Sequence, residues 1–184
     1  FVLVSFFVLL YAIYLFLRTK LIFQHAALFY CICFHLGAIG NLLFPNIEPW
    51  AAGLFLIAIG SIWAINTYST LLKPSWLGYF LSVSTVSIGT IILIEDLIQV
   101  EIISILILIL GSIFYVWASI QLSEQVIFFI GGLGLVINLP RLITEILPDN
   151  IWPPLILFLV GGVLVVVGLY LNSIRENIIS TDTE

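Results

Sequence analysis

Charged residues are scarce in this chain of 184 residues. Only 8% of the residues are charged, and 5 lysines and arginines stand against 10 aspartates and glutamates, for a net charge of −5. Proteins that bind nucleic acid need a basic patch or stripe, which so few basic residues cannot form. We therefore expect no nucleic-acid partner.

Histidine and cysteine are equally rare, with 2 of each, and methionine is absent. A structural zinc site needs four converging ligands, and a bis-histidine haem needs histidines on facing helices. His25 and His35 are instead ten residues apart in one predicted helix. We expect no metal and no cofactor. The chain begins with Phe rather than Met, so we also expect it to be part of a longer protein.

Sequence motifs of catalysis are missing as well. The chain contains no G-x-S-x-G, no H-E-x-x-H and no phosphate-binding loop. Glu95, Asp96 and Glu101 form the densest acidic group, and three carboxylates on one link make a weak cation site. The sequence therefore predicts a protein that is not an enzyme.

Apolar residues are abundant: 62% of the chain is hydrophobic and the mean hydropathy is +1.29. No water-soluble core could bury so much apolar surface, and nothing alternates as a barrel strand does. Seven apolar stretches are long enough to cross a hydrocarbon core of roughly 30 Å. They cover residues 1–17, 21–44, 50–72, 76–94, 102–122, 126–147 and 152–173. We predict an all-α, polytopic transmembrane bundle of seven spans over residues 1–174, with the lipid bilayer as its surroundings.

The basic residues between the spans predict the orientation. Arg18, Lys20, Lys73 and Arg175 lie at one side of the predicted bundle, whereas the links at the other side carry only acidic charge. By the positive-inside rule the basic side is cytoplasmic. We therefore expect the N-terminus outside and residues 175–184 as a cytoplasmic polar tail. A plasma (inner) membrane is the expected location.

An internal repeat is suggested by comparison of the chain with itself at an offset of 51 residues. This offset aligns Trp50, Glu101 and Trp152 at span starts, and Gly60, Gly111 and Gly162 within the spans. We interpret the pattern as one helix followed by three helical hairpins. The alternative is that two bilayer-length helices with short links occupy about 50 residues in any case.

Small residues form stripes at helical spacing in three of the spans. In a bilayer such stripes allow helix backbones to approach closely, although a substrate path could be lined in the same way. We take them as packing faces. The stripes are Gly53, Gly60 and Ala64; Gly78, Ser82, Thr85 and Gly89; and Gly161 and Gly168.

The sixth span carries the clearest polar pattern. Gly131, Gly134, Asn138, Arg141 and Glu145 follow one another at steps of three, four, three and four, and so lie on one helix face. Arg141 and Glu145 are spaced to form an ion pair. A charged residue inside a span is a functional-site candidate, whereas near the outer interface it would simply extend to water. Both interpretations remain open for Asn138, Arg141 and Glu145.

The second span carries the remaining polar residues. Gln24, Cys31 and His35 share one helix face, and His25 lies beside it. The ordinary explanation for such a face is a buried hydrogen bond to a neighbouring helix. We include Gln24, Cys31 and His35 in the candidate intramembrane site.

The functional prediction follows from these features. We expect a non-enzymatic integral membrane module that anchors, senses or assembles with partner membrane proteins or with itself. The alternative is a small transporter or channel whose path passes Arg141 and the polar face of the second span. No ligand can be named from the sequence.

Overall fold

A computed structural model describes residues 2–19 and 21–146, together with residues 158, 161, 162 and 165. Over residues 2–146 the fold is all-α. Its helices are α1 (Val2–Thr19), α2 (Ile22–Leu43), α3 (Pro49–Tyr68), α4 (Ser75–Leu97), α5 (Glu101–Leu122) and α6 (Gln125–Ile146). All six are long and apolar enough to cross a membrane. The predicted span over residues 152–173 lies almost wholly outside the described residues, as does the tail at 175–184.

The helix ends agree with the predicted spans to within two residues, except at the ends of α4 and α3. Helix α4 continues to Leu97, three residues past its predicted end at residue 94. We expected α3 to continue to residue 72, but it ends at Tyr68. Thr70 adopts a left-handed backbone conformation with φ of 62°, which breaks the helix. Leu72 then folds back into the core, and Pro74 directly precedes α4. The link between α3 and α4 is therefore a packed structure rather than a short tether.

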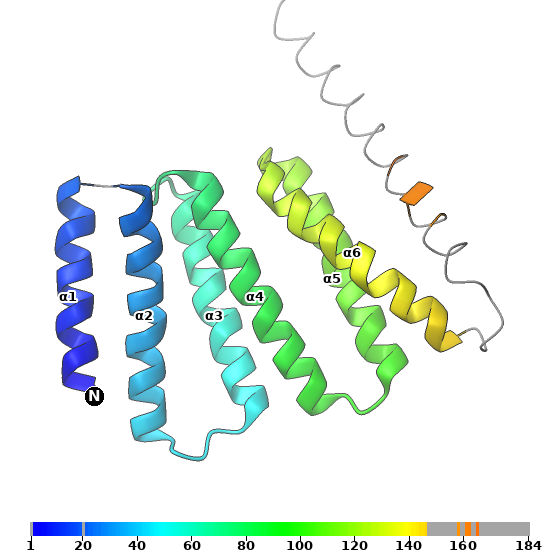
Figure 1. Ribbon diagram of the computed structural model, residues 1–184, viewed down its shortest axis with the longest axis horizontal. Helices are drawn as coiled ribbons and strands as arrows, with labels where there is room; N and C mark the ends of the chain where they lie inside the picture. The colour runs from blue at the N-terminus through cyan, green and yellow to red at the C-terminus, as the bar shows by residue number, and fades with distance from the viewer. Residues whose placement is uncertain (1, 20, 147–157, 159–160, 163–164, 166–184) are drawn as a thin grey trace, which may run out of the picture.

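The six helices form a row of three antiparallel hairpins, α1–α2, α3–α4 and α5–α6 (Figure 1). The closest backbone packing is within each hairpin, and α4 makes the main contacts between hairpins. The repeat analysis predicted a different grouping, in which the first helix stands alone. The structure does not support that grouping, because α1 packs along α2.

Glycines allow the close packing of α3 on α4. A Cβ atom added to Gly53 would lie 2.7 Å from the Gly89 carbonyl oxygen, and one added to Gly89 would lie 2.6 Å from the Gly53 oxygen. A Cβ on Gly60 would lie 2.8 Å from the Ser82 oxygen, and Gly78 is covered by Thr67. No side chain larger than hydrogen fits at these positions without a shift. The stripes predicted for the third and fourth spans are therefore packing faces.

Gly111 differs from Gly60, with which the repeat analysis aligned it. No atom of the described residues lies within 4 Å of a Cβ atom added to Gly111. Gly161 and Gly162 are equally open, and Gly168 falls outside the described residues. The aligned glycines thus do not share a packing role, and the predicted repeat is not confirmed.

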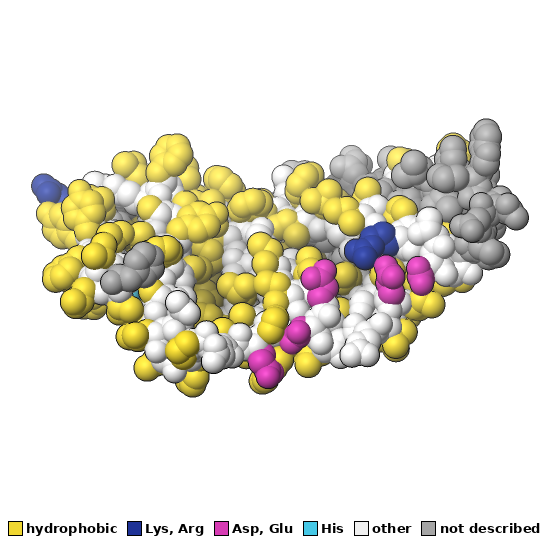
Figure 2. All heavy atoms as spheres, turned by 60° about the horizontal axis from the view of Figure 1, so that its bottom comes forward, with side chains coloured by type: hydrophobic (Ala, Val, Ile, Leu, Met, Phe, Trp, Pro, Cys, Tyr) yellow, Lys and Arg dark blue, Asp and Glu magenta, His cyan; other side chains and the backbone are white. Residues whose placement is uncertain are grey.

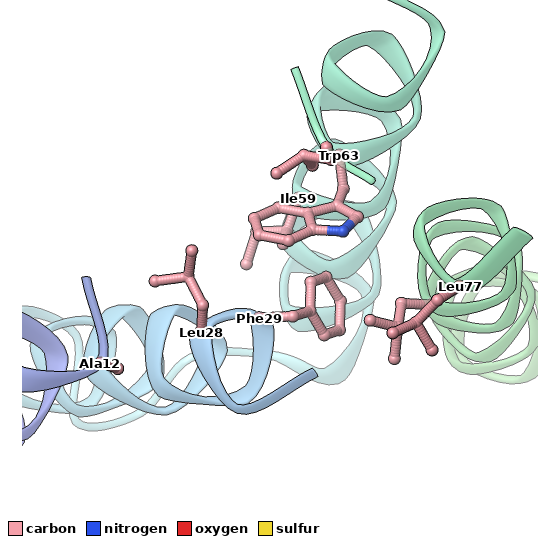
Figure 3. Close-up of a cluster of buried hydrophobic side chains, with 8 residues drawn as sticks. Ala12, Leu28, Phe29, Ile59, Trp63 and Leu77 are labelled. Atoms are coloured by element: carbon pink, nitrogen blue, oxygen red, sulfur yellow. The ribbon is translucent and has the colours of Figure 1, made fainter. Parts of the chain in front are cut away.

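The largest core cluster joins the first two hairpins (Figure 3). Phe29 of α2 meets Trp63 of α3 edge to face, with ring centroids 5.0 Å apart. Ala12, Leu28, Ile59, Leu72, Leu77 and Leu81 complete this cluster. A smaller cluster of Tyr79, Val83 and Ile127 joins the second hairpin to the third. The hairpins are therefore held to one another chiefly by side chains.

Candidate functional site

His35 on α2 makes a hydrogen bond to α1. Its Nδ1 lies 2.9 Å from the Ser5 Oγ, and both residues are buried. The Ser5 hydroxyl donates its only proton to the Val2 carbonyl oxygen, 2.8 Å away. With that proton on Val2, the Ser5 oxygen can accept from the His35 Nδ1–H. The bond ties α1 to α2.

Gln24 and Cys31 lie apart from this bond. The Gln24 side chain accepts hydrogen bonds from the Thr19 hydroxyl and from the Leu21 backbone N–H, and so closes the α1–α2 link. Cys31 lines an apolar groove of about 520 Å³ between α1 and α2. The predicted polar face of α2 therefore does not converge on one point. Across the described residues, no three metal-ligating side chains come together.

His25 is the residue of α2 whose importance the sequence analysis missed. It is fully buried, and neither ring nitrogen has a hydrogen-bond partner within the described part of the chain. Its ring centroid is 5.9 Å from that of Phe16 and 5.6 Å from that of Trp63. The indole N–H of Trp63 is also buried and unpaired there. One signal for a buried aromatic contact was available in the sequence: Trp63 lies within its span, whereas Trp50, Trp76 and Trp152 begin theirs.

The stripe on α6 faces α5. A Cβ atom added to Gly131 would lie 2.8 Å from the Ser112 carbonyl oxygen, and Gly134 lies against the Ser112 hydroxyl. Asn138 is buried and donates a hydrogen bond of 2.8 Å to the Gly134 carbonyl oxygen of its own helix. Asn138 thus lies in the contact between α5 and α6, and its amide N–H is bonded within its own helix.

Arg141 pairs across the hairpin and not along its own helix. Its Nη2 lies 3.6 Å from Glu101 Oε1 at the start of α5. Both side chains are more than half exposed, at 56% and 59%. Glu145, the predicted partner, is exposed near the end of α6. The prediction of an Arg141–Glu145 pair was wrong because the antiparallel α5 brings a carboxylate to the same membrane edge.

Acidic side chains gather at the end of the bundle where Arg141 lies. This end is at the bottom of Figure 1 and is turned toward the viewer in Figure 2, where the acidic side chains are magenta. Asp96 at the end of α4 accepts a hydrogen bond of 3.1 Å from the Trp50 backbone N–H. This bond caps the start of α3, whose first N–H groups have no partner within the helix. The Trp50 indole N–H donates to Glu48. These carboxylates therefore have structural partners.

Most hydroxyl groups inside the bundle bond to their own helix. Thr67 donates to the Trp63 carbonyl oxygen at 2.8 Å, and Thr85 donates to that of Leu81 at 2.7 Å. The same pattern of i to i−3 or i−4 bonds holds for Ser82, Ser87, Thr90, Ser112 and Ser119. Such hydroxyls are already satisfied and let helices pack closely. They do not form a continuous polar path along the described helices.

The two predicted polar sets are at opposite ends of the row. The α3–α4 hairpin lies between α2, with Gln24, Cys31 and His35, and α6, with Asn138, Arg141 and Glu145 (Figure 1). They therefore do not form one site. No family model matches this chain, and no curated protein or solved structure is significantly similar to it. The class that the fold defines is a multi-pass α-helical membrane protein.

Proposed function

We propose that this protein is a non-enzymatic membrane module that assembles with partner membrane proteins or with further copies of itself. The observation that carries the proposal is the way its polar groups are used. Within the described helices, the buried serine and threonine hydroxyls and the Asn138 amide N–H bond to their own helix or tie two helices together. A transport path needs polar groups that are available to a solute.

The open row of hairpins also supports an assembly role. In α1, only 11% of the most apolar stretch is buried against the rest of the protein, compared with 44% in α4. The outer hairpins therefore leave broad apolar faces for lipid or for other membrane helices. Helix association in a bilayer depends on close packing and interhelical hydrogen bonds, and such faces can provide the packing.

The alternative of a small transporter or channel predicts a different outcome in reconstituted vesicles. We expect proton, sodium and potassium fluxes no greater than those of protein-free vesicles. One sample of the protein labelled with a donor dye and one labelled with an acceptor dye are reconstituted together. Energy transfer between them should persist as the protein is diluted with more lipid, because a specific assembly survives dilution. Flux above that of protein-free vesicles, without persistent energy transfer, would contradict the proposal.

The energy-transfer assay contains only this protein, so it does not detect assembly with a partner of a different sequence. Crosslinking in the native membrane covers that case, because a stoichiometric partner gives one product of fixed mass. A photo-crosslinking residue replaces Phe7, which is exposed on α1. The matched control carries the same replacement at Ala12, which is buried on the same helix. An assembly through the α1 face should give a product from residue 7 and none from residue 12.

A further inference from the structure

A buried histidine occupies the contact between the α1–α2 and α3–α4 hairpins. His25 is completely inaccessible, and both of its ring nitrogens lack a hydrogen-bond partner in the described part of the chain. The backbone of Lys73 lies near the ring but makes no hydrogen bond of ordinary geometry to it. Buried polar atoms in proteins are nearly always paired, so an unpaired buried imidazole demands an explanation.

Aromatic rings surround the imidazole. Phe16 of α1 and Trp63 of α3 contact it, and Phe29, one turn further along α2, also packs against Trp63. Leu72, from the α3–α4 link, belongs to the same cluster. The surroundings thus come from both hairpins, and His25 lies where they meet.

On the elements that pack around His25, the charged side chains described at this end of the bundle are Arg18 and Lys73, and the tyrosines there are Tyr14, Tyr68 and Tyr79. Tyr11, Tyr30, Cys31, Cys33 and His35 lie further along α1 and α2, and Glu48, Glu95 and Asp96 lie at the opposite end. Arg18 donates to the Tyr14 hydroxyl at an exposed position. At this end of the described bundle the carboxylate is Glu124, which interacts with Tyr79 and belongs to the link between α5 and α6. Among the described residues, no carboxylate is therefore placed to pair with a protonated His25.

The neutral and the protonated imidazole fit this contact very differently. A neutral ring leaves one donor and one acceptor without a partner, which costs much less free energy than burying a charge. An imidazolium would be an unpaired ion in an apolar interface, with Arg18 and Lys73 at the same end of the bundle. Attraction to the faces of Phe16 and Trp63 offsets only part of the cost of removing an ion from water. Protonation therefore favours a state in which water reaches the ring.

The fold allows such a state. The α3–α4 backbones are in direct contact through glycines, whereas the α1–α2 hairpin meets α3–α4 mainly through side chains. His25 lies in the first turn of α2, close to the membrane edge, so a small separation of the hairpins would open it to water. A two-state contact whose balance depends on protonation is how histidine-based switches work.

We propose that His25 is a proton-operated latch that holds the α1–α2 hairpin against the α3–α4 hairpin while neutral and releases it when protonated. The sign follows from linkage: the closed state binds the proton less well, so closure is favoured at high pH and weakens as the pH falls. This inference goes beyond the proposed assembly role and does not depend on the identity of any partner.

Trp63 is the natural reporter for this latch. Replacing Trp50, Trp76, Trp117 and Trp152 with Phe leaves Trp63 as the only tryptophan. In phosphatidylcholine vesicles, we expect the accessibility of Trp63 to acrylamide to rise about two-fold or more between about pH 8 and about pH 5, the range over which histidine switches act. The emission maximum should shift to longer wavelength over the same range.

The variants His25→Phe and His25→Gln provide the test of cause. Neither side chain can take up a proton, so both should abolish the pH response, while His35→Gln on the same helix should retain it. A constant Trp63 accessibility in the protein that keeps His25 would overturn the proposal. A full pH response in His25→Gln would also overturn it. His25→Gln keeps a polar side chain at this position, so it provides the test even if His25→Phe disturbs folding.

Discussion

The individual polar residues of this protein are used mainly to join helices. His35 and Ser5 form the clearest case, because both are buried and their bond joins α1 to α2. Sequence analysis could place His35 on a polar face of α2, but it could not identify Ser5. The reason is physical: a helix face can be derived from spacing, whereas the partner depends on the register between two helices.

Removal of the Ser5 hydroxyl should destabilise the α1–α2 hairpin. Ser5→Ala leaves the buried His35 Nδ1–H without an acceptor, at a cost of about 1–3 kcal/mol in unfolding free energy. Unfolding in mixed detergent micelles measures the change. Ser5→Ala combined with His35→Leu should recover much of the loss, and Ser61→Ala, at an exposed position on α3, should change stability by less than about 0.5 kcal/mol.

The Arg141–Glu101 ion pair should contribute little to stability. Both side chains are more than half exposed, and exposed pairs contribute roughly 0–1 kcal/mol because water and salt screen them. A double-mutant cycle with Arg141→Gln and Glu101→Gln should give a small favourable coupling that weakens with added salt. In the corresponding cycle of Arg141→Gln and Glu145→Gln, the two changes in unfolding free energy should be additive. A larger coupling to Glu145 than to Glu101 would show that the helix-internal pair is the relevant one.

At the scale of the helices, the sequence predicted type and position well because hydropathy and proline act locally. Proline before α4 and at the start of α3 gave those boundaries to within a residue or two. The early end of α3 was not predicted, because the left-handed Thr70 and the inward Leu72 depend on the core that the link covers. The packing faces of α3 and α4 were predicted correctly, since small residues mark them directly.

Gly60 and Gly111 test whether a helix interface can be inferred from glycine alone. Gly60→Leu would force its side chain into Val86 and the Ser82 backbone, so we expect a loss of about 1–3 kcal/mol through overpacking. Gly111→Leu meets open space and should lie within about 0.5 kcal/mol of the unmodified protein. Thermal unfolding in detergent compares the two. Equal losses would mean that α5 is covered at Gly111 in the detergent-solubilised protein.

At the scale of the whole molecule, the structure departs most from what the sequence predicted. Hairpin grouping could not be derived from chain order, because every helix of a serial antiparallel array has two sequence neighbours and packing selects one. Here the Gly53–Gly89 contact selects α3–α4, and the Gly131–Ser112 contact selects α5–α6. The separation of the two predicted polar sets follows from the same choice, since it places α2 and α6 on either side of the central hairpin.

The orientation of the whole array in the membrane remains a prediction from its charges. Arg18 and Lys73 lie at one end of the described helices, and Glu48, Asp96 and Glu101 lie at the other. Because cytoplasmic links are rich in lysine and arginine, the acidic end should face outward. After Cys31 and Cys33 are replaced with Ala, Asn46→Cys and Gln99→Cys should react with a membrane-impermeant maleimide on intact cells. Ser75→Cys should react only after the membrane is made permeable. The reverse pattern would invert the orientation, and labelling of all three positions on intact cells would show that α3 and α4 do not both cross the membrane.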